Sequence, residues 1–178
     1  MSKKVLIISS SPRINGNSDL LCKEFERGAK EAGNETELIH FKDKKINYCT
    51  GCGSCFTKKE CVQKDDMKEV LEKMLNADVI VLSTPVYFYS LCGQMKTLID
   101  RTCPKYEQIS DKEFYFILTA ADTNIRAMQR TVEDFRGFLD CLNNPVEKKI
   151  LYGVGVWNKG DIVNLPIMDE AYKTGKNL

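Results

Sequence analysis

The sequence predicts an α/β fold: a doubly wound, five-stranded parallel sheet with helices on both faces. Short apolar runs alternate with segments of helical periodicity along the chain. The first apolar run, 5–9, is continuous, as in a strand that is buried on both faces of a parallel sheet. The length, 178 residues, suits one domain with a sizeable core. Strands that alternate with helices form such a sheet through right-handed crossovers, so we expect residues 1–178 to be a single domain.

The expected strands are short and rich in apolar residues. They are residues 5–9, 36–41, 78–82, 113–119 and 149–157. The expected helices between and after them are residues 17–32, 66–75, 91–103, 125–142 and 164–174. Gly33 and Gly175 are expected to end the first and the last helix, and Ser90 to cap the third. Asp66 and Glu69 form a capping-box pattern at the start of the second.

Composition excludes several classes of function. Lys and Arg number 26 against 25 Asp and Glu, so no global charge directs the chain to nucleic acid or an anionic membrane. The N-terminus is basic and then apolar, but the apolar run is too short for a signal peptide and no A-x-A cleavage site follows. No stretch approaches the ~20 apolar residues of a membrane span. We therefore expect a cytoplasmic protein with no membrane or nucleic-acid partner.

Four of the eight cysteines lie within thirteen residues, in a loop at 42–64 that lacks periodicity. They form a C-x2-C-x2-C-x5-C motif made of Cys49, Cys52, Cys55 and Cys61. Gly51 and Gly53 lie between them, where a backbone that folds back on itself needs freedom in φ. Bacterial ferredoxins use a similar run for an iron–sulfur cluster, so we expect a [4Fe–4S] cluster here. A zinc site, and an empty or redox-active thiol site, remain alternatives.

The other four cysteines belong to apolar helical stretches. They are Cys22, Cys92, Cys103 and Cys141. Each is expected to be a small buried residue.

The loop after the first strand, residues 9–18, is rich in hydroxyl and amide groups and leads into a helix. Backbone N–H groups and the helix dipole can hold an anion there, and Ser11, Asn17 and Ser18 could add side-chain donors. The loop matches neither the G-x-G-x-x-G motif that binds dinucleotides nor the G-x-x-x-x-G-K-[ST] motif that binds nucleoside triphosphates. A monophosphate is therefore the better fit. An ordinary capped turn is the alternative.

Several segments resemble the NADPH-dependent FMN reductase family of flavodoxin-like proteins. They are Ser11-Pro12-Arg13-x-Asn15-Gly16-Asn17-Ser18, Asp65-Asp66-Met67, Thr84-Pro85-Val86-Tyr87-Phe88, Met95-Lys96 and Ile99-Asp100-Arg101. With the four cysteines between the second strand and the second helix, the chain is more similar to the iron–sulfur flavoprotein branch. The Gly that usually precedes Ser-Pro-Arg in the family is Ser10 here.

The resemblance implies a flavodoxin-like fold with FMN at the carboxyl ends of the strands. The implied FMN-binding residues are Ser9, Ser11, Arg13, Asn15, Asn17 and Ser18 in the first loop, Thr84, Pro85, Val86, Tyr87 and Phe88 after the third strand, and Thr119, Ala120, Ala121 and Asp122 after the fourth. The aromatic residues among them could equally be core or interface residues.

No side chain is expected to be catalytic, since the flavin itself carries the chemistry. His40 is assigned no catalytic role, and Asp100 with Arg101 is expected to form a helix-end ion pair or to touch a partner subunit. The predicted function is an FMN-dependent oxidoreductase that couples two-electron and one-electron donors and acceptors through the cluster. Alternatives are an NAD(P)H-dependent flavin or quinone reductase without a working cluster, and a non-catalytic electron carrier or redox sensor.

The expected partners are NAD(P)H, a quinone or flavin, or a ferredoxin-like protein. The lysines around the cysteine loop are expected to be a solvated face, and the alternative is a basic rim that favours an acidic electron-transfer protein. The resemblance also implies a homodimer or a higher oligomer.

Overall fold

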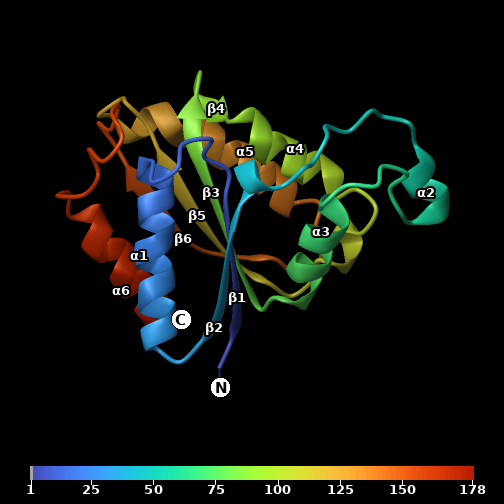
Figure 1. Cartoon of the computed structure of the whole chain (residues 1–178), viewed down its shortest axis with the longest axis horizontal. Coiled ribbons are helices and arrows are strands. Elements are labelled where there is room, and N and C mark those ends of the chain that lie inside the picture. The colour runs from blue at the N-terminus through green and yellow to red at the C-terminus, as the bar shows by residue number, and fades with distance from the viewer. Residues whose placement is uncertain (1) are drawn as a thin grey trace.

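One sheet organises the molecule. The structure is a computed structural model that describes residues 2–178. Five parallel strands lie in the order β2-β1-β3-β5-β6, which is the flavodoxin-like arrangement (Figure 1). Their bounds are β1 Lys4–Ser9, β2 Glu35–His40, β3 Val79–Tyr87, β5 Glu113–Thr119 and β6 Val146–Gly153. The short strand β4, Ser90–Leu91, pairs antiparallel with the end of β3. The expected fold class is confirmed.

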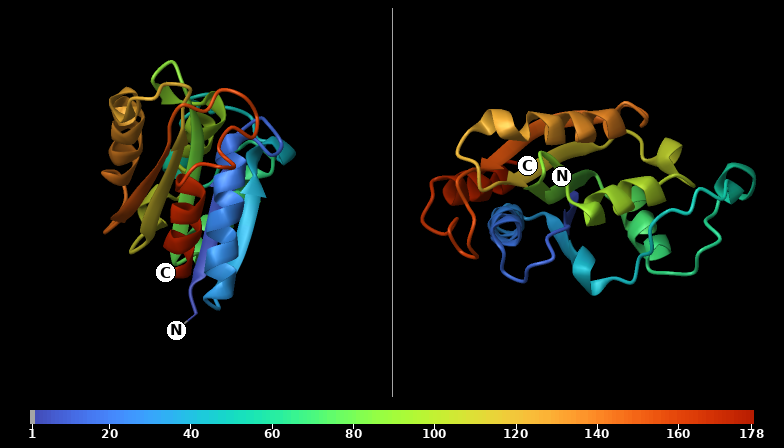
Figure 2. Two further views of the ribbon diagram at one scale, coloured as in Figure 1. Left: turned by 90° about the vertical axis from the view of Figure 1, so that its left-hand side faces the viewer. Right: turned by 90° about the horizontal axis from the view of Figure 1, so that it is seen from above.

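Two separate apolar cores lie on the two faces of the sheet. Figures 1 and 2 show the helices that cover both faces. Helices α1, Asn17–Glu31, and α6, Ile167–Lys176, lie on one face. Helices α3, Met67–Asn76, α4, Gly93–Arg101, and α5, Gln129–Leu139, cover the other. The central strands are buried on both sides because their apolar runs are continuous. Because the strands are parallel and Ser9 pairs with Ser83 and Pro85 with Thr119, the carboxyl ends of β1, β3 and β5 meet at one edge.

The segment between β2 and α3 leaves the body of the fold. It begins with a single 3₁₀ turn, Phe41–Asp43, and contains the five-residue helix α2, Ser54–Lys58. No residue of α2 is buried. In Figures 1 and 2 this cysteine loop extends sideways, away from the sheet and beyond α3 and α4.

The backbones of helices α1 and α6 come into close contact at two glycines, Gly28 and Gly175. A Cβ atom on Gly28 would lie 2.1 Å from the Tyr172 carbonyl oxygen, and one on Gly175 would lie 2.0 Å from the Phe25 carbonyl oxygen. The prediction that Gly175 ends the last helix is wrong, because α6 continues to Lys176. Gly175 is required instead for close contact between two helix backbones.

Other element boundaries also differ from expectation. Cys92, not Ser90, is the N-cap of α4, because Ser90 pairs within the β3–β4 hairpin. Strand β6 begins and ends earlier than predicted, and the helix expected from residue 125 starts with the 3₁₀ turn Ile125–Met128. Asp66 caps no helical N–H with its side chain. Neighbouring Asp65 accepts the Met67 N–H instead, at 3.2 Å.

Among residues 2–178, no helix combines the length and the apolar character that crossing a bilayer requires.

Candidate functional site

The loop after β1 makes a tight turn before α1 begins. The Arg13 N–H donates to Ser11 Oγ at 3.2 Å, and the Gly16 N–H donates to the Arg13 carbonyl oxygen at 3.1 Å. A Cβ atom on Gly16 would lie 3.1 Å from Ser11 Oγ, so a larger residue could not enter without a shift. Asn15 has a φ of 52°, in the left-handed region that Asn tolerates. These residues close a compact loop at the carboxyl end of β1.

Helix α1 begins without a side-chain cap, because its N-cap residue is Gly16. Within residues 2–178, no backbone hydrogen bond outside the regular elements uses the N–H of Asn17, Ser18 or Asp19. The first N–H groups of a helix have no partner inside the helix, and the helix dipole makes that end positive. The loop and the helix start therefore present unpaired donors that suit an anion such as a phosphate.

Asp19, in the first turn of α1, stabilises this loop through its side chain. Its buried carboxylate accepts the Asn15 N–H at 2.9 Å, and its oxygens lie 2.9 Å from His40 Nδ1 and 3.2 Å from Lys23 Nζ. His40 ends β2, so this contact joins the loop to the neighbouring strand. The only histidine of the chain thus has a structural partner.

The side chains of Asn17 and Ser18 bond to protein groups. Asn17 Oδ1 accepts the N–H groups of Gly160 and Ile162 at 3.1 and 3.3 Å, and its Nδ2 donates to the Asn158 carbonyl oxygen at 2.9 Å. Ser18 Oγ lies 2.6 Å from Thr119 Oγ1, at the end of β5. Both residues are buried and fasten the first loop to segments more than 100 positions away.

Ser9 points into the core rather than into the loop. Within residues 2–178, its buried hydroxyl makes no hydrogen bond of ordinary geometry, and it lies near the thiol of Cys22 in α1. Burial raises the pKa of Cys22 to about 12, so this thiol remains protonated. Arg13 is exposed, and its Nη1 donates to the Trp157 carbonyl oxygen at 3.0 Å. The segment 157–162 was not among the expected site residues, although its Trp157 is the only tryptophan of the chain.

The second loop is formed by the end of β3 and by its hairpin with β4. Thr84 is buried, and its Oγ1 accepts the Cys92 N–H at 3.2 Å. The hairpin turns at Phe88 and Tyr89, which have φ values of 50° and 64°. Positive φ at both central residues is typical of a type I′ turn, which usually contains Asn or Gly. The strained turn leaves the Phe88 side chain 100% exposed.

The third loop follows β5 and is bound to the end of β6. The Ala120 N–H donates to the Gly153 carbonyl oxygen at 2.9 Å, and the Gly155 N–H donates to the Asp122 carbonyl oxygen at 2.9 Å. Asp122 and Ala121 are exposed. All three predicted loops therefore meet at the carboxyl edge of the sheet, which is where ligands bind in open α/β folds.

The cysteine loop closes on a small pocket of about 30 Å³ against the end of α4. The four motif cysteines line it, and so does Cys103, which follows α4. Gly51 and Gly53 have φ values of 68° and 73°, so the expected need for glycine between the thiols is confirmed. Cys55 Sγ lies 3.5 Å from Cys103 Sγ.

Four thiols from one short loop match the donors that an iron–sulfur cluster uses. Across residues 2–178, however, no group of three or more His, Cys, Asp or Glu side chains is placed to hold a single metal ion. A hydrogen bond from the Ser54 backbone lowers the pKa of the exposed Cys52 thiol. Burial, and then the neighbouring Cys55 thiol, raise the pKa of Cys103 to about 11. The four motif thiols fit a cluster in number and chemistry, while Cys103 remains a protonated thiol beside them.

Two of the cysteines predicted to be buried are not. Cys22 and Cys92 are buried as expected, but Cys103 is only half-buried and Cys141 is exposed. Cys141 lies just beyond the end of α5 and Cys103 lines the cysteine pocket.

A buried ion pair closes the base of the cysteine loop. The side chains of Arg101 and Asp65 are 2% and 5% exposed, and the two guanidinium N–H groups reach the two carboxylate oxygens at 2.8 and 2.9 Å. Arg101 also donates to the Asn47 carbonyl oxygen at 2.5 Å and to Gln63 Oε1 at 3.4 Å. One guanidinium thus binds both ends of the loop. The expected pairing of Arg101 with Asp100 is wrong, because Asp100 pairs with Lys96 instead.

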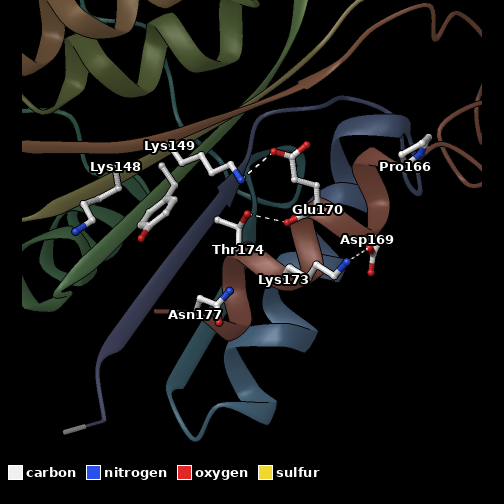
Figure 3. Close-up of a pocket in the computed structure, with 9 residues that line it drawn as sticks. Lys148, Lys149, Pro166, Asp169, Glu170, Lys173, Thr174 and Asn177 are labelled. Atoms are coloured by element: carbon white, nitrogen blue, oxygen red, sulfur yellow. Dashed lines mark hydrogen bonds and ion pairs between the residues drawn. The ribbon is translucent and has the colours of Figure 1, made fainter.

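A larger groove, of about 530 Å³, lies elsewhere, between the first half of β6 and helix α6 (Figure 3). Four of its five charged residues form two ion pairs, and the fifth, Lys148, lies 3.6 Å from Glu113 on β5. Lys149 Nζ lies 2.8 Å from Glu170, and Lys173 Nζ lies 2.5 Å from Asp169. The groove contains none of the loops at the carboxyl edge, and each of its charged side chains already has a partner.

Comparison with known proteins agrees with this geometry. The family model described as NADPH-dependent FMN reductase matches residues 3–157, a range that includes the three loops and the cysteine loop. An iron–sulfur flavoprotein of Archaeoglobus fulgidus is 44% identical over 101 residues, which cover 57% of this chain and 46% of that protein. One from Methanocaldococcus jannaschii is 46% identical over 101 residues, which cover 57% and 52%. The chain thus spans about half the length of the curated relatives it matches.

Solved structures share the fold. A flavone reductase superposes with a TM-score of 0.73 at 26% identity, covering 98% of this chain and 61% of that one. An NAD(P)H:quinone oxidoreductase from Methanothermobacter marburgensis superposes with a TM-score of 0.80 at 18% identity, covering 99% and 96%. The second likeness concerns the fold alone.

Proposed function

The chain belongs to the NADPH-dependent FMN reductase family, and from this premise we propose that it is an FMN-dependent oxidoreductase. The observation that carries the proposal is the uncapped start of α1 beside the Ser11–Gly16 turn, at the edge where three loops meet. The turn and the first N–H groups of α1 would bind the phosphate of FMN. The rest of the cofactor would be lined by the other two loops. These are Thr84 and Pro85 with the turn at Phe88 and Tyr89, and the loop at 119–122.

We propose different roles for the implied residues. Arg13 is exposed and would face the ligand, and the buried Ser11 would shape the turn by accepting the Arg13 N–H. Asn17 and Ser18 would hold the loop in place through their own hydrogen bonds. Ser9 would contribute through its backbone, since its hydroxyl is buried beside Cys22. When bound, FMN accepts a hydride and releases electrons singly, so no side chain has to act as an acid or base.

Cofactor reconstitution tests this assignment. We expect FMN to bind tightly, riboflavin to bind more weakly because it lacks the phosphate, and FAD not to bind. Replacing Ser11 by Glu places a carboxylate near the phosphate. Two like charges 4 Å apart near a surface repel by about 4 kcal/mol, so FMN affinity should fall several-hundredfold. Ser2→Glu, at the opposite end of the sheet, is the control and should leave affinity unchanged. Equal binding of riboflavin and FMN would contradict the phosphate site.

We further propose that Cys49, Cys52, Cys55 and Cys61 hold a [4Fe–4S] cluster. Support comes from the compact motif, from the positive φ values of Gly51 and Gly53, and from the names of the curated relatives. A cluster would let the protein exchange single electrons while FMN exchanges pairs. Iron and acid-labile sulfide should each be about four per chain in anaerobically reconstituted protein. Cys52→Ala should abolish the visible cluster absorption but leave FMN bound. Stoichiometric zinc without iron or sulfide would favour the plain reductase.

We propose the chemical classes of the electron donors and acceptors. A nicotinamide nucleotide, a quinone or a free flavin suits the family, and a ferredoxin-like protein would suit the lysines around the cysteine loop. Tyr48 and Phe56 project from that loop, 74% and 70% exposed, and could contact such a protein. Steady-state oxidation of NAD(P)H with a quinone or flavin acceptor distinguishes an enzyme from a non-catalytic carrier, which would show no turnover.

We propose that the active unit is a homodimer or a higher oligomer. Phe88 is wholly exposed on a strained turn beside the proposed flavin site, and Tyr87 and Tyr89 flank it. Exposed aromatic clusters of this kind mark interfaces. Light scattering should give at least twice the chain mass, and Phe88→Asp should lower it. A wild-type monomer at micromolar concentration would contradict the proposal.

A further inference from the structure

Cys103 is a fifth thiol in a pocket whose motif contains four. It comes from the turn after α4, whereas the other four belong to one loop. Its sulfur lies 3.5 Å from that of Cys55, although the two residues are 48 positions apart. A cubane cluster needs four thiolates, so the motif alone can complete the site and leaves Cys103 without a role in it.

We propose that Cys55 and Cys103 form a reversible disulfide when the cysteine pocket holds no metal. Forming it needs a small movement, since a disulfide joins its sulfurs at about 2.05 Å and these lie 3.5 Å apart. Cys55 lies in the short helix α2, no residue of which is fully buried, so little packing opposes its approach. Cys103 is the fixed partner. It directly follows Thr102, which is buried and hydrogen-bonded to the Ile99 carbonyl oxygen at 2.8 Å.

The oxidant is a hydroperoxide. One thiolate attacks a peroxide oxygen, the O–O bond breaks, and a sulfenic acid and hydroxide result. The sulfur of the second cysteine then attacks the sulfenic sulfur, the S–S bond forms, and water leaves. In sum, two thiols and one hydrogen peroxide give one disulfide and two waters. A dithiol reductant reverses the change by exchange.

The disulfide would act as a lock, by which we mean that it prevents metal from binding at the empty site. With Cys55 bonded to Cys103, the motif retains three thiols and cannot supply four ligands. Pairing also keeps Cys55 from the irreversible sulfinic and sulfonic states. This consequence for metal loading rests on the proposed role of Cys55 as a ligand, whereas the disulfide itself does not.

Peptide mapping tests the disulfide directly. Metal-free, fully reduced protein is treated with one equivalent of hydrogen peroxide, alkylated in denaturant and digested with trypsin without reduction. The chain contains eight cysteines, and we expect two of the eight thiols to be lost. Trypsin releases Cys103 in peptide 102–105, Cys55 in peptide 46–58 and Cys61 in peptide 60–64. We expect 102–105 linked to 46–58, with the bond at Cys55.

Two variants sharpen the result. Cys103→Ser should abolish the linked peptide, while Cys141→Ser, which removes an exposed thiol outside the pocket, should leave its yield unchanged. If peptide 102–105 is alkylated throughout while thiols disappear elsewhere, the proposed disulfide is wrong.

Metal loading tests the lock. Co²⁺ serves as the probe, because its bonds to thiolates absorb strongly. Purified disulfide-linked protein should show at least a tenfold loss of this signal, and dithiothreitol should restore it. Full cobalt binding by the linked protein overturns the lock. If only the cluster proposal is wrong, the result is different. The reduced protein would then contain no iron or sulfide after reconstitution, but the peptide map would still show the linked peptides.

Discussion

Replacing Asp65 by Asn should destabilise the protein strongly, because it breaks the buried ion pair at the base of the cysteine loop. Each Asp65 oxygen accepts one N–H of Arg101 and one backbone N–H, from Asn47 at 3.1 Å or Met67 at 3.2 Å. An amide group replaces one of these oxygens with a donor, so two hydrogen bonds are lost whichever way the side chain turns. Arg101 also keeps its charge, which is then buried without a counter-ion.

The expected cost is about 3–5 kcal/mol, the usual range for breaking one side of a buried pair. Two lost bonds to a charged group, at about 1.5–3 kcal/mol each, give a similar figure. The free energy of unfolding of a native protein is about 5–15 kcal/mol, so this cost is a large fraction of it. With a urea m-value of about 2 kcal/mol/M, the unfolding midpoint should fall by roughly 1.5–2.5 M.

Urea unfolding followed by circular dichroism measures this shift, with Asp169→Asn as the control. Asp169 pairs with Lys173 on the surface, where both side chains are more than 60% exposed. Its loss should cost less than about 1 kcal/mol. Equal midpoints for the two variants would refute the reasoning. Replacing both partners, as Asp65→Leu with Arg101→Met, should cost less than Asp65→Asn alone, because no buried charge remains.

Three further predictions follow from the same structure. Burial would raise the pKa of Asp65, but its bonds from Arg101, Asn47 and Met67 together lower it, so the pair's stabilisation should be complete above about pH 4 and lost as pH falls through the lowered pKa. The difference in unfolding free energy between wild type and Asp65→Asn, measured from pH 6 to pH 2, should shrink accordingly. Gly175→Ala should cost about 1–3 kcal/mol by forcing α1 and α6 apart, whereas Gly137→Ala, in open space on α5, should stabilise by up to about 1 kcal/mol. Asn17→Ala should cost about 1–3 kcal/mol, since it leaves the buried N–H of Ile162 without a partner, and urea unfolding would show no change if that bond were unimportant.

Local patterns in the sequence determined the fold class. Continuous apolar runs predicted the strands, and helical periodicity predicted the helices that cover them, because both patterns report which faces are buried. The cysteine spacing and the polar run at 9–18 likewise identified two loops of the candidate site, since their chemistry lies within a few consecutive residues. The need for glycine at Gly51 and Gly53 followed from the same local reasoning.

Only the tertiary structure decided which distant residues complete those loops. Cys103 reaches Cys55, and Arg101 reaches Asp65, because α4 packs beside the cysteine loop. Asn17 bonds to backbone groups more than 140 positions away, which no local pattern could indicate. Gly175 was read as a helix end because glycine often ends helices, but the reason for it is contact with another helix. Spacing along the chain sets the period of an element, whereas contacts between elements depend on how they pack, and that is decided by the fold as a whole.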